Sequence, residues 1–174
     1  MVLGSGLGGF ADAVSDPVEL PYGDIPGWPA STAIGHAGTL VFGRFGDVPV
    51  AVMKGRAHLY EGLSPTDVVF GVRVLGRLGV RSLVLTNACG TIDPSIEPGT
   101  LVAIADHLNL QGSSPLVGPN EEALGPRFPD MTDAYDPAIA PSHAGRRPRW
   151  ASTSGRASTQ PGSGPPSRLR QRSG

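Results

Sequence analysis

Five polar or ionisable side chains fall within eight residues of the segment KGRAHLYEGLSP: Lys54, Arg56, His58, Tyr60 and Glu61. Arg56 and His58 alternate at strand spacing, so both side chains point to one face, which Tyr60 could share. An arginine offers a fork of donors that matches phosphate, an imidazole adds a donor, and Glu61 could orient that imidazole. The segment therefore predicts an anion site, although a solvated strand end would carry the same residue types.

Two glycine-rich turns could add donors to such a site. The turn GSGLGG begins at Gly4 and offers unhindered backbone N–H groups and the hydroxyl of Ser5, which could cradle a phosphate. It is not a P-loop, because no Gly-Lys-Ser/Thr follows, and it lacks the helical pattern that follows a dinucleotide fingerprint. The turn GHAG places His36 between glycines. Each turn, taken alone, is also compatible with a purely structural role.

A third candidate lies at the end of the apolar run SLVLTNACG. This run is typical of a buried central strand, and α/β sheets bind their ligands at the carboxyl ends of such strands. The ending TNACG offers a hydroxyl, an amide and exposed backbone there. Cys89 is interpreted as a small packing residue, because no catalytic base can be assigned to it. Asp106 and His107 are interpreted as structural residues of a later strand.

The remaining patterns predict the elements that position these residues. Residues 2–3 are the short end of a strand, residues 40–53 form a hairpin around Gly46-Asp47, and residues 82–90 and 100–110 are further strands. A helix begins at Ser64, with Pro65 in its first turn and Asp67 completing a capping box. Its apolar face carries Val68, Val72 and Leu75, and Gly79 ends it. This order predicts an α/β fold.

The charge distribution separates the last part of the chain from the rest. Residues 1–140 hold all 15 acidic groups and seven basic ones, a net charge of −8, whereas residues 141–174 hold seven arginines and no acid. We expect residues 1–140 to be one partial domain and residues 141–174 to be a disordered Arg/Ser/Pro/Gly-rich tail, since such a composition buries little apolar surface. The abrupt change of charge and periodicity favours an out-of-frame translation product of a GC-rich gene as the origin of this tail, and a basic nucleic-acid-binding tail is the alternative.

Composition also restricts the compartment and the partners. The single cysteine excludes an internal disulfide and indicates a reducing compartment. No apolar run approaches the roughly 18 residues of a membrane span. The body is acidic, and aromatic residues are not interleaved with the tail arginines, among which only Trp150 is aromatic. Both features argue against nucleic acid as a partner. We therefore expect a cytoplasmic protein with neither a membrane nor a nucleic acid as its partner.

Taken together, five segments resemble the trimeric class of purine nucleoside phosphorylases. In this chain they are VLGSGLGGF, GHAGTLVFG, GRAHLYEG, GVRSLVLTNACGTIDPSIEPGTLVAIADHLNL and GPNEEALGPRFPDMTDAYD. The resemblance runs from Val2 to about Ala140. It implies a three-layer fold with a central mixed β-sheet flanked by helices, here incomplete. The same family includes the methylthioadenosine phosphorylases.

The resemblance also implies roles for individual residues. The catalytic residues would be His58 and Glu61, and the ribose would contact Tyr60 and, from a neighbouring subunit, Phe128. Inorganic phosphate, a co-substrate, would bind at Ser5, His36, Arg56, His58 and the backbone amide of Ala88. The implied reaction is phosphorolysis of purine ribo- and deoxyribonucleosides to the free base and the (deoxy)ribose 1-phosphate in purine salvage. It needs no metal and no cofactor, and it implies a homotrimer.

The chain departs from the family pattern in three places. Cys89 and Thr91 stand where purine nucleoside phosphorylases usually carry Ala and Gly, and the resulting ACG resembles methylthioadenosine phosphorylases. The helix that normally precedes the glycine turn is absent. Residues 141–174 contain no counterpart of the purine-binding segments, so we expect a truncated enzyme with no purine site in this chain. A catalytically incompetent fragment and a methylthioadenosine phosphorylase are the alternative functions.

Overall fold

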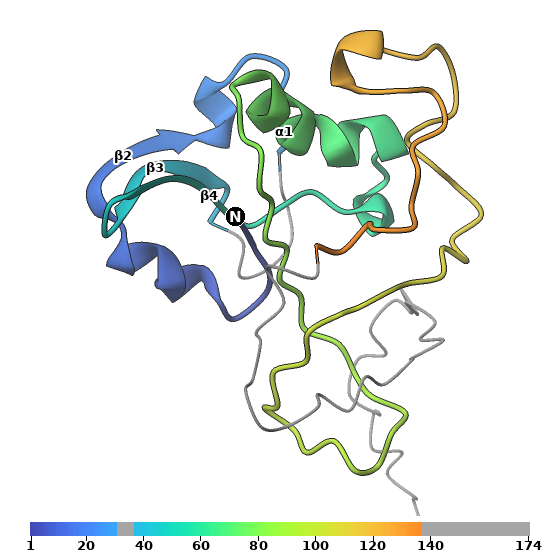
Figure 1. The fold of residues 1–174 in the computed structure, drawn as a ribbon. Coiled ribbons are helices and arrows are strands. Elements are labelled where there is room, and N and C mark those ends of the chain that lie inside the picture. Colours follow the sequence, from blue (N-terminus) through green and yellow to red (C-terminus); the bar gives the residue numbers. More distant parts are fainter. Residues whose placement is uncertain (31–36, 137–174) are drawn as a thin grey trace, which may run out of the picture. The chain divides into compact units, whose positions relative to one another are not determined.

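The computed structural model describes residues 1–30 and 37–136 (Figure 1). Four strands form one mixed sheet in the order β1-β4-β3-β2. Their bounds are β1 Val2–Leu3, β2 Ser15–Pro21, β3 Thr39–Phe45 and β4 Val48–Lys54. β1 pairs with β4 in parallel, while β2 and β4 run antiparallel to β3. The sheet thus confirms the mixed, incomplete sheet expected from the sequence.

The hairpin of β3 and β4 forms as predicted. Its ladder runs from Thr39 opposite Lys54 to Phe45 opposite Val48 without a register shift. Gly46 has a φ of 56°, a conformation that glycine adopts at little cost in a tight turn. Strand β2 was not predicted, and all seven of its residues are exposed. It lies at the edge of the sheet, where the pattern of burial that reveals a strand is weakest.

Helix α1 (Pro65–Arg77) begins and ends where the sequence predicts. The backbone N–H of Asp67 donates to Ser64 Oγ, and the carboxylate of Asp67 accepts from the backbone N–H of Ser64, which completes the capping box. Gly79 has a φ of 92°, as expected of a glycine just beyond a helix C-terminus. Within the predicted apolar face Leu75 is buried, whereas Val68 and Val72 are only partly covered.

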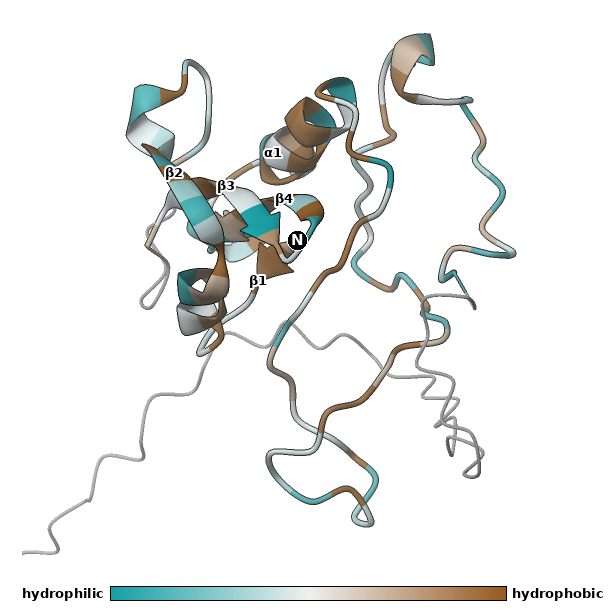
Figure 2. Ribbon diagram, turned by 60° about the vertical axis from the view of Figure 1, so that its left-hand side comes forward, coloured by the Kyte–Doolittle hydropathy of each residue, from teal (hydrophilic) through white to brown (hydrophobic). Residues whose placement is uncertain are grey.

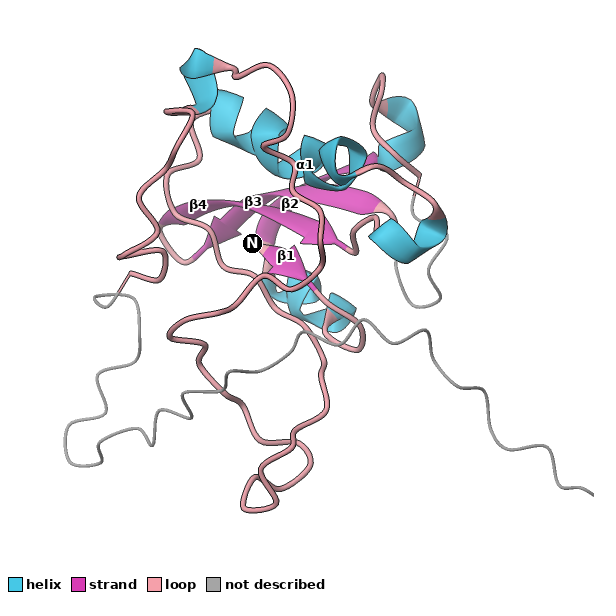
Figure 3. Cartoon of the chain, turned by 90° about the vertical axis from the view of Figure 1, so that its right-hand side faces the viewer, coloured by secondary structure: helices cyan, strands magenta, loops and turns pink. Residues whose placement is uncertain are grey.

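The core has two layers, one on each face of the sheet (Figure 3). Under α1, the buried side chains of one cluster include Trp28, Leu40, Met53 and Leu75. The opposite cluster packs the short 3₁₀ helix η1 (Gly8–Ala13) against Leu3, Val41 and Val52 and their neighbours. Helical turns on both faces of a central sheet agree with the predicted three-layer arrangement.

Two predicted strands do not form, at residues 82–90 and 100–110. Leu83, Val84 and Leu85 are 40%, 40% and 63% exposed, and they make only one isolated bridge, between Val2 and Leu85. Leu101 is 92% exposed. The physical reason is that a strand needs neighbours: β1 is two residues long, and among the described residues no other strand pairs with residues 82–90. Apolar stretches therefore lie along the extended chain after α1 (Figure 2).

The chain divides into two compact units. The first comprises residues 1–101 and 113–129, and the described part of the second comprises residues 102–112 and 130–136. The predicted boundary near residue 140 lies outside the described residues. Within the described ranges no helix is long and apolar enough to cross a membrane.

Candidate functional site

The polar segment that follows β4 is anchored to the core at its first residue. The buried phenol of Tyr22 donates a hydrogen bond of 2.8 Å to the carbonyl of Gly55, and its ring stacks on Trp28 at 4.8 Å. Tyr22 belongs to the 3₁₀ turn η2 (Tyr22–Asp24), which packs beside α1 in the first core cluster. Gly55 has a φ of 99°, so the chain turns sharply there, immediately before Arg56.

Arg56 lies against the end of the predicted strand of residues 82–90. Its Nη1 donates a hydrogen bond of 2.8 Å to the carbonyl oxygen of Thr86, across 30 residues of sequence. The guanidinium is half-buried, and this desolvation lowers its pKa, while Tyr60 acts in the opposite direction. A desolvated guanidinium held by a backbone carbonyl is a fixed positive charge to which an anion would be attracted.

His58 and Glu61 form the hydrogen-bonded pair that the sequence predicted. His58 Nδ1 lies 3.0 Å from Glu61 Oε1, and the same carboxylate oxygen accepts from the backbone N–H of His58 at 2.7 Å. The side chains are 19% and 5% exposed, respectively. They are joined by the short turn η3 (Leu59–Glu61). Since a carboxylate accepts, the proton between them sits on Nδ1, and this fixes the orientation of the ring.

Tyr60 covers the imidazole from one side. Its ring stacks on that of His58 with 4.7 Å between the ring centroids and an angle of 18° between the planes. Tyr60 is itself 65% exposed. The pair therefore offers an exposed aromatic surface beside a histidine whose orientation is fixed.

The glycine turn after β1 packs directly on the chain at Thr86. The backbone N–H of Gly4 donates to Thr86 Oγ1 at 2.9 Å, and Gly4 is buried. A Cβ at Gly4 would lie 2.6 Å from the carbonyl oxygen of Thr86 and 2.9 Å from the Cα of Asn87, so only glycine permits this approach. Ser5 follows on the exposed side of the turn, and Ala88 lies two residues beyond Thr86.

The structure thus brings together three of the segments that the sequence singled out: the glycine turn, the segment after β4 and the ending TNACG. Predicted site residues carried by these segments are Ser5, Arg56, His58, Tyr60, Glu61 and Ala88. His36 lies outside the described residues. Thr86 joins the segments. The sequence places its hydroxyl at the end of an apolar run, but only long-range contacts reveal its partners.

The surroundings of Phe128, Cys89 and His107 complete the account of the residues that the sequence singled out. Phe128 is 87% exposed, and Cys89 is exposed rather than packed as the sequence analysis expected. In the second unit, the hydroxyl of Tyr135 lies 3.0 Å from His107 Nδ1, so His107 has a structural partner, although not on a strand. Within the described ranges no three His, Cys, Asp or Glu side chains gather in a way that could hold a metal ion.

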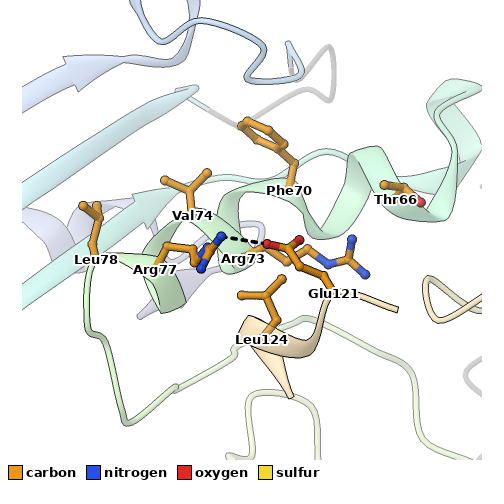
Figure 4. A pocket seen from close by; sticks show the side chains of 8 residues that line it. All are labelled: Thr66, Phe70, Arg73, Val74, Arg77, Leu78, Glu121 and Leu124. Atoms are coloured by element: carbon orange, nitrogen blue, oxygen red, sulfur yellow. Dashed lines mark ion pairs between the residues drawn. The ribbon is translucent and has the colours of Figure 1, made fainter. Parts of the chain in front are cut away.

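A cavity of about 330 Å³ opens elsewhere, between α1 and the 3₁₀ turn η4 (Glu122–Leu124) (Figure 4). Its apolar lining includes Phe70, Val74 and Leu124, and Arg77 pairs with Glu121 at its rim with 3.0 Å between the charged atoms. None of the predicted site residues lines it. The arrangement around Thr86 therefore remains the candidate site, with donors suited to a phosphate rather than to an apolar ligand.

Comparison with known proteins places this arrangement in a broader context. Residues 1–140 match the model of the phosphorylase superfamily. The chain is 53% identical over 135 residues to purine nucleoside phosphorylase 1 of Geobacillus stearothermophilus, covering 78% of this chain and 49% of the relative. It is 48% identical over 139 residues to the purine nucleoside phosphorylase of Rattus norvegicus, covering 78% and 48%.

A solved structure with a similar fold is also a purine nucleoside phosphorylase. The crystal structure of Schistosoma mansoni purine nucleoside phosphorylase in complex with inosine is similar, with a TM-score of 0.71 and 41% sequence identity. The match covers 79% of this chain and 49% of that structure. The chain spans about half the length of the curated relatives it matches.

Proposed function

Because the chain belongs to the phosphorylase superfamily, we propose that it carries the phosphate site of a purine nucleoside phosphorylase. The proposed reaction is phosphorolysis of purine ribo- and deoxyribonucleosides, such as inosine and guanosine, in purine salvage. The observation that carries the proposal is the convergence of Arg56 and the glycine turn, both of which bind Thr86 directly. His58 lies two residues beyond Arg56 in the same segment. The relatives' names point to the same substrate class.

In this proposal each residue contributes to holding or activating phosphate. The fork of Arg56, the imidazole of His58, the hydroxyl of Ser5 and the backbone amide of Ala88 would donate to phosphate oxygens, and His36 would lie close by. Glu61 holds the His58 ring through Nδ1, which would leave Nε2 for a phosphate oxygen. Fixed donors hold phosphate against the sugar without reorganisation during the reaction.

The chemical step is a substitution at C1′ of the sugar. The bond between C1′ and the purine nitrogen breaks with its electron pair leaving on the base, and positive charge develops on the ribose. A phosphate oxygen bonds to C1′, and the proton of hydrogen phosphate ends on the base. Phosphate is a co-substrate in this proposal and no cofactor takes part. The donors hold the phosphate in place, and the negative charge of the phosphate stabilises the positive charge that develops on the ribose.

The ribose and the neighbouring subunit belong to the same proposal. Tyr60, 65% exposed and stacked on His58, would contact the ribose. Phe128, 87% exposed, would reach the sugar of a neighbouring subunit in a homotrimer.

A lone exposed cysteine, Cys89, supports a reducing, cytoplasmic location.

The test is phosphate-dependent cleavage of inosine by the 174-residue chain, with hypoxanthine and ribose 1-phosphate quantified by chromatography. Binding of inorganic phosphate is measured on the same samples by calorimetry. We expect Arg56→Ala to weaken phosphate binding on the order of 10- to 100-fold, because a charge-assisted hydrogen bond is lost. Arg77→Ala is the matched control, since Arg77 pairs with Glu121 outside the site. A chain that neither binds phosphate nor cleaves inosine would contradict the proposal.

Binding without cleavage would favour the alternative of an incompetent fragment, in which the phosphate site persists without turnover. Cleavage of 5′-methylthioadenosine in preference to inosine would favour a methylthioadenosine phosphorylase, to which the ACG at residues 88–90 also points.

A further inference from the structure

Thr86 forms hydrogen bonds with the other two segments of the candidate site, the glycine turn and the segment after β4. Its Oγ1 accepts from the backbone N–H of Gly4 at 2.9 Å, and its carbonyl oxygen accepts from Arg56 Nη1 at 2.8 Å. A third set of contacts ties Thr86 to β1: its backbone N–H and its hydroxyl donate to the carbonyl of Val2 at 3.0 and 3.2 Å. One residue therefore links the glycine turn, the arginine and the sheet.

We propose that Thr86 is a positioning residue of the phosphate site, whose hydroxyl fixes the glycine turn and whose carbonyl orients Arg56. The proposal rests on the phosphate site put forward above. Thr86 is not itself assigned a contact with phosphate; it acts through Gly4, next to Ser5, and through the Arg56 guanidinium.

The hydrogen-bonding capacity of the hydroxyl explains why threonine suits this position. A hydroxyl has one donor and two acceptor sites, and Thr86 uses the donor toward Val2 and an acceptor toward Gly4. Valine has nearly the same shape but can do neither, so the buried N–H of Gly4 would lose its partner. Serine keeps both bonds. The hydrogen bond from Gly4 to Thr86 and the close packing of the two backbones help to set the position of Ser5. Small displacements of donors weaken an anion site markedly.

The close approach of Gly4 to Thr86 supports the same inference independently. The space between the two backbones would not accept a Cβ, which would lie 2.6 Å from the Thr86 carbonyl oxygen. That oxygen is the one that Arg56 binds. A shift of the glycine turn would therefore also disturb the carbonyl oxygen that Arg56 binds. The position of the glycine turn and the position of the Arg56 guanidinium thus depend on each other.

Thr86→Val tests the proposal, with Thr86→Ser as the conservative rescue. Thr100→Val is the matched control, because its hydroxyl binds only within its own turn, to the carbonyl of Glu97. Two quantities are measured on each variant of the 174-residue chain: amide hydrogen exchange at Gly4 by NMR, and the dissociation constant of inorganic phosphate by calorimetry. We expect Thr86→Val to speed exchange at Gly4 and to weaken phosphate binding roughly 5-fold or more. Thr86→Ser restores both, and Thr100→Val changes neither.

The exchange pattern distinguishes positioning from a loss of overall stability. Faster exchange confined to the glycine turn, with the amides of β3 and β4 unchanged, supports positioning. Unchanged exchange at Gly4 in Thr86→Val overturns the proposal, and so does faster exchange spread evenly over the sheet. Should the wild-type chain fail to bind phosphate, the proposed function fails, while exchange at Gly4 still decides whether Thr86 fixes the turn.

Discussion

The hairpin at residues 39–54 and the segment at residues 100–110 have similar apolar sequences and different outcomes. In the hairpin, Leu40, Val41 and Val52 are at most 2% exposed. In the second segment, Leu101 and Leu110 are 92% and 67% exposed, and no strand forms. Apolar character is thus insufficient for a strand; the difference lies in where each segment finds its hydrogen-bonding partner.

The hairpin obtains its partner locally, because a two-residue turn at Gly46 and Asp47 returns the chain on itself. Residues 82–90 find only the two-residue β1, and among the described residues no strand pairs with residues 100–110. An isolated extended segment has neither ladder hydrogen bonds nor a cover for its side chains.

Truncation of a core residue should have the largest effect. Leu75 is 1% exposed between α1 and the sheet, so Leu75→Ala should lower the free energy of unfolding by about 2–5 kcal/mol. Leu101→Ala, at a residue 92% exposed, should change it by less than about 0.5 kcal/mol. Urea unfolding followed by circular dichroism measures both. An equal loss in the two variants would contradict the contrast between the regions.

Two glycines of α1 should respond to alanine with opposite signs. A Cβ at Gly71 would lie 2.6 Å from Trp28 Cζ2 and 2.8 Å from Met53 Cε, so Gly71→Ala should destabilise the fold by about 1–3 kcal/mol through overpacking. Nothing lies within 4 Å of the same position at Gly76, where alanine should stabilise the helix by about 0.5–1 kcal/mol. Thermal unfolding of the two variants gives the signs. A stabilising Gly71→Ala would show that the contact between helix and sheet is loose.

Removing the Tyr22 hydroxyl should destabilise the fold and alter its pH dependence. Tyr22→Phe deprives the Gly55 carbonyl of its phenol donor, at a cost of about 1–3 kcal/mol. Burial raises the pKa of Tyr22 above its ordinary value, so folding favours the neutral phenol. The free energy of unfolding therefore keeps the full contribution of the buried phenol below the unfolded pKa of about 10. It falls as the pH rises above that value, because the unfolded state loses the phenol proton first.

Denaturant unfolding between pH 7 and pH 11 measures both effects of Tyr22→Phe. The variant should be less stable at pH 7 and should show a smaller loss of stability at alkaline pH than the wild type. Tyr60→Phe, at a residue 65% exposed, is the control at pH 7, where its stability should equal that of the wild type. An unchanged alkaline loss in Tyr22→Phe would mean that another group causes it.

The smallest predicted change in the free energy of unfolding comes from replacing one of two serines. Ser64 caps α1, and Ser64→Ala should cost about 1 kcal/mol because the Asp67 N–H loses its acceptor. Ser95 binds only the carboxylate of Asp93 in an exposed turn, so Ser95→Ala should stay within about 0.5 kcal/mol. Urea unfolding of the pair measures the difference. A costlier Ser95→Ala would indicate that residues 91–97 are held more firmly than their exposure implies.

Local sequence determined the elements whose partners lie nearby. The capping box of Ser64 and Asp67, the stop at Gly79 and the turn at Gly46 each rest on contacts within a few residues. The same holds for the pairing of His58 with Glu61, three residues apart. Such features follow from residue type and spacing, because side-chain geometry alone brings the groups together.

Only the tertiary structure decided the contacts between residues that are far apart in the sequence. Thr86 meets Arg56 and Gly4 across 30 and 82 residues, and Tyr22 meets Gly55 across 33. The sequence offered a hydroxyl or a phenol at these positions but no partner. It also predicted strands at residues 82–90, which pair only through one bridge at Leu85, and at residues 100–110, which form no strand. The reason is that β structure depends on neighbours that the local sequence pattern cannot supply.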